Sequence, residues 1–172
     1  MHIAYTTSPG RGETDLLLYS FAEALLAQGR KPVGTVQINT DCGGPGLCDM
    51  DVKVLPDGPV IRISQSLGAG AKGCRLDPSA LETSVGIAEQ GLETDADCLI
   101  INKFGKHEAS GAGFRPVIAK ALEKGIPVIV GVGRLNQEAF AEFTGGMATS
   151  LEPDVASLMQ WFEECAREGQ AA

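Results

Sequence analysis

A short apolar run over residues 97–102 is followed by side chains that could bind an anion. The run reads Asp-Cys-Leu-Ile-Ile-Asn, and two lysines and a glutamate follow it. A run of this length and apolarity is typical of a buried strand. In open α/β sheets, ligands bind outside the carboxyl ends of the strands. We therefore expect a ligand site whose mouth is formed by Asn102, Lys103, Lys106 and Glu108.

The loop over residues 6–14 lies between an expected strand and an expected helix, which is the context of a phosphate-binding loop. That motif reads G-x-x-x-x-G-K-[ST], and its lysine reaches the phosphates. Here Thr7 and Gly12 take the two glycine positions, and Glu13 takes the lysine position. Because a carboxylate would repel a triphosphate, we interpret the loop as a βα turn with acidic residues at the helix start. The helix N-terminus still attracts anions, so Thr7 and Gly12 remain candidate binding residues.

The end of the 97–102 run also departs from the pattern of nucleotide-hydrolysing proteins. Such proteins have an aspartate here to hold Mg²⁺, whereas this chain has Asn102 and Lys103. One hypothesis is that Lys103 binds an anion in place of the missing loop lysine. A second is that Lys103 and Glu13 form an ion pair, and a third is that Lys103 and Lys106 are solvated loop residues. The sequence leaves the three open.

Two glycine-rich loops, 40–48 and 68–76, carry further candidates. Thiolates and a carboxylate are ligands for a soft metal, and the candidate ligand set is Cys42, Cys48, Cys74 and Asp49. The spacing differs from the C-x₂-C pair of zinc sites. The alternatives are a thiol made reactive by a neighbouring cation, and cysteines that pack as small apolar residues.

Arg75 precedes an expected helix, and its planar guanidinium can bind two oxygens of an oxyanion. With other loop residues it would form a cationic cleft in an otherwise acidic protein. The residues of this cleft are Lys72, Gly73, Arg75, Lys103, Lys106 and Arg134. We therefore expect an anionic small molecule as the ligand.

Composition narrows the class of protein. The chain has 172 residues, 44% of them hydrophobic, and a net charge of −8. This acidity argues against nucleic-acid binding, which needs a basic surface. The first residues do not have the pattern of a signal peptide, and no apolar run approaches the roughly 20 residues of a membrane span. We expect a cytoplasmic protein, and a homo-oligomer is compatible with the sequence.

Strands and helices alternate along the chain, which predicts an α/β fold. We expect a three-layer sandwich with a mostly parallel, P-loop-like sheet, in one domain over 1–172. An Asp-Gly pair between two extended runs predicts an antiparallel hairpin inserted at about 48–64. The other expected strands are 2–6, 33–39, 97–102, 126–132 and a short edge strand near 147–149. The expected helices cover 14–28 and 153–167 and begin near Pro78, Phe114 and Asn136. Asp77 is the expected cap of the helix at Pro78, and Asn136 is the expected cap of the helix that it begins.

Four blocks of sequence, taken as a set, resemble a bacterial family described as a domain of unknown function. The blocks are 48–51, 61–65, 68–77 and 102–108. Members of that family often lie beside genes of molybdenum ABC transporters or molybdenum enzymes. The resemblance covers nearly the whole chain and implies a P-loop-like fold and a link to molybdenum metabolism.

The arrangement is also similar to small P-loop nucleoside-triphosphatases. Their Asp-Glu-x-Gly-x-x-Glu segment corresponds to 102–108, where only Gly105 and Glu108 match in type. The triphosphatase roles of the first two positions therefore do not transfer to Asn102 and Lys103.

Three functions are compatible with these observations. We favour a binding or accessory protein over an enzyme: it would bind molybdate, tungstate or a phosphorylated small ligand, and its partner would be a molybdenum transporter or molybdoenzyme component. The second is a divergent nucleoside-triphosphate hydrolase or kinase, in which Lys103 replaces the loop lysine and Glu108 or Asp49 holds Mg²⁺. The third is a catalytically inactive regulatory interaction module.

Overall fold

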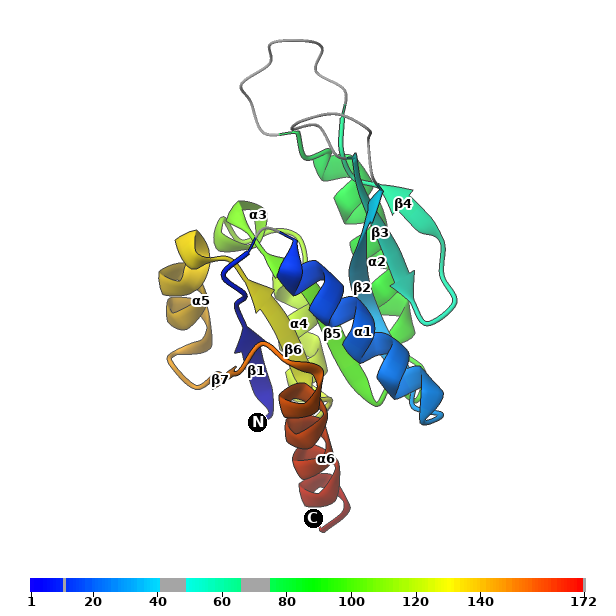
Figure 1. The fold of residues 1–172 in the computed structure, drawn as a ribbon, viewed down its shortest axis with the longest axis vertical. Coiled ribbons are helices and arrows are strands. Elements are labelled where there is room, and N and C mark those ends of the chain that lie inside the picture. Colours follow the sequence, from blue (N-terminus) through cyan, green and yellow to red (C-terminus); the bar gives the residue numbers. More distant parts are fainter. Residues whose placement is uncertain (11, 41–48, 66–74, 172) are drawn as a thin grey trace.

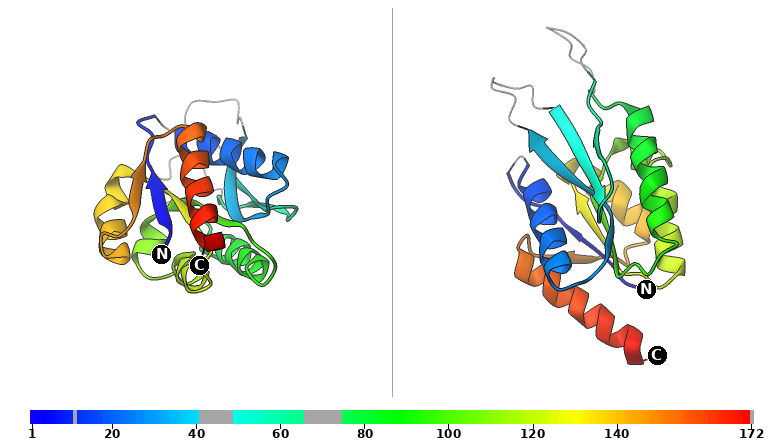
Figure 2. Two further views of the ribbon diagram at one scale, coloured as in Figure 1. Left: turned by 90° about the horizontal axis from the view of Figure 1, so that it is seen from below. Right: turned by 90° about the vertical axis from the view of Figure 1, so that its right-hand side faces the viewer.

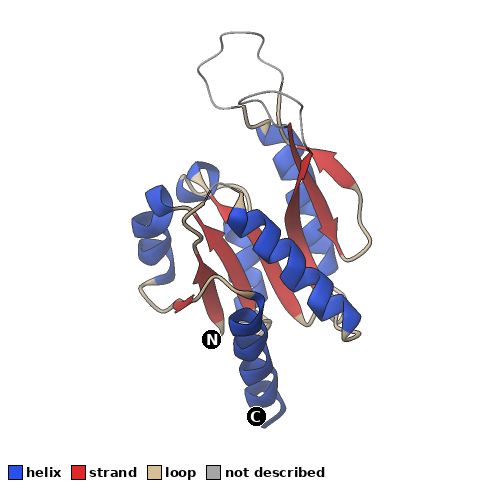
Figure 3. Ribbon diagram, viewed as in Figure 1, coloured by secondary structure: helices blue, strands red, loops and turns tan. Residues whose placement is uncertain are grey.

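The computed structural model describes residues 1–10, 12–40, 49–65 and 75–171. One sheet of seven strands carries helices on both faces (Figures 1 and 3). The strands are β1 (Ile3–Thr6), β2 (Pro32–Thr40), β3 (Asp49–Leu55), β4 (Val60–Arg62), β5 (Cys98–Phe104), β6 (Val128–Val132) and β7 (Thr149–Leu151). The helices are α1 (Glu13–Ala27), α2 (Pro78–Gly91), α3 (Lys106–Ala109), α4 (Arg115–Glu123), α5 (Gln137–Thr144) and α6 (Val155–Ala171), and a 3₁₀ turn η1 (Arg134–Asn136) precedes α5.

The sheet is mostly parallel, as predicted. Its strand order is β4-β3-β2-β5-β6-β1-β7. β2, β5, β6, β1 and β7 run parallel to one another, while β3 pairs antiparallel with β2 and β4 pairs antiparallel with β3. The first two strands of the chain are parallel but not adjacent, because β5 and β6 lie between them. The carboxyl ends of β1, β5 and β6 therefore meet at one edge of the sheet, which we call the carboxyl edge.

Two separate apolar layers hold the helices to the sheet (Figure 2). On one face, α1 and α6 bury Leu18, Phe21 and Phe162 against the strands. On the other face, α2, α4 and α5 bury side chains such as Val85 and Phe140. The apolar residues that recur at helical spacing in the sequence are thus the residues that the helices bury. Among the described helices, none combines the length and the apolarity that crossing a membrane requires.

The inserted hairpin is confirmed and consists of β3 and β4. The turn over 56–58 closes with a hydrogen bond from Gly58 N to Val54 O at 2.9 Å. β4 ends at Arg62 rather than at the predicted residue 64, because Ser64 leaves the hairpin and forms a bridge with Leu76 instead. The Asp77 side chain caps α2 by accepting from two backbone amides, as the sequence predicted.

Three local predictions need correction. β5 continues past Asn102 to Phe104, so Lys103 is a strand residue. The edge strand β7 begins at Thr149, where it pairs with β1. The side chain of Asn136 makes no capping bond to described residues, because η1 starts this helical segment with a backbone bond from Asn136 N to Gly133 O at 2.8 Å.

Candidate functional site

A β-bulge presents Lys103 at the carboxyl edge. β5 and β6 pair at Ile101 and Val130, and again at Phe104 and Val132, so β5 has one residue more between the two pairs. Such bulges often lie beside functional sites, where they change the direction of a side chain. Lys103 is the exposed residue of a strand whose other six residues are buried. The bulge thus places Lys103 at the carboxyl end of the central strand as its one exposed residue.

The bulge depends on a glycine in the neighbouring strand. A Cβ on Gly131 would overlap the backbone oxygen of Asn102 and would lie 3.0 Å from side-chain carbons of Thr14 and Leu18. Sequence reasoning missed Gly131, although a glycine inside a run of branched apolar residues is a signal of close backbone approach.

We expect Gly131→Ala to lower the free energy of unfolding by about 2 kcal/mol, because the added methyl forces backbone atoms apart. Gly133→Ala is the matched control, since a Cβ there meets no atom of the described chain within 4 Å and the φ of −74° suits alanine. Urea denaturation followed by circular dichroism measures both. Equal stability of the two variants would contradict the close approach.

Asn102 connects three elements under the candidate site. Its Oδ1 accepts a hydrogen bond from Gln37 N, and its Nδ2 donates to Asp15 Oδ1, both at 2.9 Å. The residue is 5% exposed. β2 and β5 pair only as far as Thr35 and Ile101, so the Asn102 side chain continues the contact between the strands where the ladder ends. Asn102 is therefore not an exposed residue of the site but holds the strand end that carries Lys103. No local pattern in the sequence indicated that Asp15 and Gln37 bind Asn102.

Glu108 closes the turn that carries Lys106. The Glu108 carboxylate is 3% exposed. It accepts from Gly105 N at 2.9 Å and from Phe114 N at 3.4 Å. His107 joins the same turn to α2 through a contact of 2.8 Å between its Nε2 and Glu82 Oε1. The short helix α3 was not predicted, and this buried carboxylate is the reason that so short a segment is ordered.

Three cationic residues end or follow the neighbouring strands β5 and β6 at the carboxyl edge. Lys103 and Lys106 come from the end of β5 and the start of α3, and Arg134 follows β6, the strand adjacent to β5. All three are exposed. Within the part of the chain that the structure describes, none of them forms an ion pair. Their charges are therefore available to an anion from solution.

The loop after β1 is hydrogen-bonded both to β6 and α5 and to the start of α1. Thr7 Oγ1 donates to Val132 O at 2.6 Å and accepts from Gln137 Nε2 at 3.3 Å. Glu13 accepts a hydrogen bond from Gly10 N. Lys103 and Glu13 do not form the ion pair that the sequence left open, since the Glu13 carboxylate accepts from Gly10 N of its own loop. Gly12 precedes α1 in the left-handed conformation, with φ 78°.

Arg75 lies on the hairpin side of this edge, where β2 ends and β3 begins. Its Nη2 contacts Asp49 Oδ1 at 3.2 Å, and Arg62 Nη1 contacts Asp49 Oδ2 at 2.8 Å. Two guanidinium groups thus bind the carboxylate that we had considered as a metal ligand. The candidates Cys42, Cys48, Lys72, Gly73 and Cys74 lie outside the described residues. Among those described, no three His, Cys, Asp or Glu side chains are grouped as a metal site would need.

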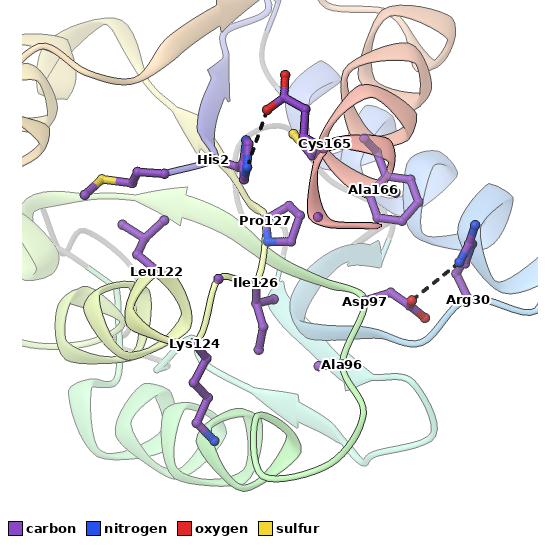
Figure 4. Close-up of a pocket in the computed structure, with 15 residues that line it drawn as sticks. His2, Arg30, Ala96, Asp97, Leu122, Lys124, Ile126, Pro127, Cys165 and Ala166 are labelled. Atoms are coloured by element: carbon purple, nitrogen blue, oxygen red, sulfur yellow. Dashed lines mark ion pairs between the residues drawn. The ribbon is translucent and has the colours of Figure 1, made fainter. Parts of the chain in front are cut away.

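A pocket of about 600 Å³ lies at the opposite edge of the sheet, between the amino ends of the strands and the C-terminal half of α6 (Figure 4). Its charged side chains are paired: His2 Nε2 is 3.7 Å from Glu168 Oε2, and Arg30 Nη1 is 3.6 Å from Asp97 Oδ1. Burial raises the pKa of the Cys165 thiol in its wall to about 11, so this cysteine is protonated at neutral pH. Among the described residues of its wall, the pocket therefore has no reactive thiol, and its charged side chains have partners.

The family of the chain follows from its sequence. Residues 3–161 match the family described as "Protein of unknown function (DUF2478)". The chain belongs to this family. The family resemblance expected from the four sequence blocks is therefore confirmed. The DUF2478 match extends over both helix layers and the hairpin, so it includes all elements of the carboxyl edge.

Comparison with curated proteins gives a relative linked to molybdenum. The chain is 37% identical over 153 residues to "Molybdenum import ATP-binding protein ModC 2" of Bradyrhizobium diazoefficiens. The match covers 88% of this chain but only 17% of the relative. The chain thus spans about a sixth of the length of that protein.

Two solved structures share the fold. THEP1 from Aquifex aeolicus has a TM-score of 0.65 and 17% sequence identity, covering 95% of this chain and 96% of that one. A human cancer-related nucleoside triphosphatase has a TM-score of 0.59 and 19% identity, with 87% of each chain covered. The P-loop-like α/β fold predicted from the sequence is thus confirmed. At these identities the similarity concerns the fold alone.

Proposed function

We propose that this protein is an accessory protein of molybdenum or tungsten metabolism that binds an oxyanion or a phosphorylated small molecule at the carboxyl edge. Its place of action would be the cytoplasm. The observation that carries the proposal is Lys103, an exposed lysine that a bulge presents from a central, otherwise buried strand. The position agrees with the rule that ligands bind at the carboxyl ends of strands in such sheets.

The electrostatics of the edge support an anionic ligand. The chain as a whole has a net charge of −8, yet three exposed cations end or follow the adjacent strands β5 and β6 and form no ion pair in the described chain: Lys103, Lys106 and Arg134. Charge-assisted hydrogen bonds from ammonium and guanidinium groups are the usual contacts of tetrahedral oxyanions.

The relative suggests a partner. A segment similar to this chain is part of a longer protein whose name states molybdenum import and ATP binding. Segments joined in one polypeptide act at one place, so we propose that this chain works beside an ATP-binding component of molybdenum import. The oxyanion would then be the transported molybdate or its analogue tungstate.

Isothermal titration calorimetry of the reduced full chain tests this function. Molybdate, tungstate, sulfate, phosphate and ATP with Mg²⁺ are titrated separately. We expect saturable binding of molybdate or tungstate and weaker binding of sulfate. Binding of ATP with Mg²⁺ but of none of the oxyanions would overturn the proposal and favour the divergent nucleotide enzyme, and no binding at all would favour the interaction module.

We expect Lys103→Ala to weaken oxyanion binding by about tenfold, the effect of one charge-assisted hydrogen bond. Lys31→Ala is the control, because Lys31 is also exposed but precedes β2 at the opposite edge of the sheet. Both variants remove one positive charge, so a general effect of net charge would weaken them equally. Equal affinities of the two variants would show that Lys103 does not contact the ligand.

A further inference from the structure

The first βα loop already holds an anion, which is its own Glu13 carboxylate. Gly10 N donates to Glu13 Oε2 at 2.8 Å, and Ser8 N donates to Thr14 Oγ1 at 3.0 Å. The carboxylate lies so close to Gly10 that a Cβ there would overlap it. Two amide donors of the loop thus have acceptors from the first turn of α1.

The residues present do not fit the triphosphate and Mg²⁺ that this fold holds elsewhere. Such sites use a loop lysine for the phosphates and an aspartate for the metal. This chain has Glu13 at the lysine position, and the amide of Asn102 at the aspartate position donates to Asp15. A triphosphate in this loop would meet the Glu13 carboxylate at short range and would be repelled.

Thr6 adds a buried polar group on the α1 side of the strand that precedes the loop. Thr6, the last residue of β1, is completely buried, and its hydroxyl has no hydrogen-bond partner in the described chain. Thr6 pairs with Gly131, and the same face of Gly131 is covered by Thr14 and Leu18 of α1. Thr6 therefore lies on the face of the sheet that the start of α1 covers. Buried hydroxyls without partners are rare and need an explanation.

We propose that Glu13 is a tethered internal anion that closes the loop to external phosphates. Tethering gives the carboxylate a high effective concentration at Gly10 N, and its charge repels competing anions. The inference goes beyond the proposed function, since it concerns donors of the loop and does not involve Lys103. It also explains how a P-loop-like fold can bind an oxyanion on the β5–β6 side without binding nucleotides.

The test uses the ¹⁵N-labelled full chain and inorganic pyrophosphate without a metal. The amide signals of Ser8 and Gly10 are followed by NMR in the wild type, Glu13→Ala, Glu13→Gln and the control Glu23→Ala. Glu23 is an exposed residue of the same helix, and its side chain makes no hydrogen bond or ion pair within the described chain. The spectra themselves show whether each variant is folded.

We expect no saturable shift of the Gly10 amide in the wild type or in Glu23→Ala. In Glu13→Ala the Ser8 and Gly10 amides should move saturably, at pyrophosphate concentrations at least about tenfold below the highest one tested on the wild type. Glu13→Gln keeps an acceptor without the charge and should fall between them. A wild type that responds like Glu13→Ala, or a Glu13→Ala variant that does not respond, would overturn the proposal. Neither result depends on whether molybdate binds near Lys103.

Discussion

Gly34→Ala is expected to lower the free energy of unfolding by about 4 kcal/mol, the largest effect of any single methyl group that we identify. Gly34 has φ +111°, a conformation that side chains rarely adopt. A Cβ there would also overlap the backbone carbonyl of Ile100, the partner of Gly34 in β5. Strain from the positive φ costs about 1–2 kcal/mol, and forced separation of packed backbones adds about 1–3 kcal/mol.

Gly86→Ala is the control for this substitution. Gly86 is an exposed residue in the middle of α2, and a Cβ there would meet no described atom within 4 Å. Alanine should stabilise this helix by about 0.5–1 kcal/mol, because glycine is the poorer helix former. The midpoint of urea denaturation should therefore fall for Gly34→Ala and rise for Gly86→Ala. A Gly34→Ala variant as stable as the wild type would show that β2 and β5 do not approach so closely.

The second large effect is expected for Asn102→Asp, which should cost about 3 kcal/mol at neutral pH. The new carboxylate could still accept from Gln37 N, but it would replace the donor to Asp15 with a second negative charge. Two carboxylates at hydrogen-bond distance cannot both stay ionised in a site that is 5% exposed. The cost should shrink as the pH falls, because a proton shared between the two carboxylates restores a hydrogen bond.

The control Asn136→Asp makes the same chemical change at a partly exposed position of η1. It adds the same net charge without a carboxylate partner, so it should change stability little at any pH. The comparison is made by thermal denaturation at neutral and mildly acidic pH. An Asn102→Asp variant whose stability follows that of Asn136→Asp at both pH values would contradict the contact with Asp15.

Much of the fold could be predicted because its signals are local. The alternation of strand and helix patterns predicted the mostly parallel sheet, and the Asp57-Gly58 turn predicted the hairpin. Asp77 before Pro78 predicted the start of α2 correctly. In each case the residues that decide the structure are neighbours in sequence, so their types and spacing carry the information.

The candidate site was harder to predict because long-range contacts form it. The bulge that presents Lys103 needs Gly131 in another strand, and Asn102 is held by Asp15 and Gln37 from two other elements. The buried Glu108 likewise orders α3 through the amide of Phe114. The sequence indicated which strand end carries the cations, but the side chains that hold this end in place lie far away in the chain.

We propose that an oxyanion binds at the carboxyl edge beside Lys103. Crystals of the protein grown with sodium tungstate test it most directly, since tungsten is located by its anomalous X-ray scattering. We expect a tungsten peak at the end of β5, with the Lys103 ammonium group in contact with the oxyanion. A tungsten peak only in the pocket at the opposite edge, or none in crystals that hold tungstate at saturating concentration, would contradict it.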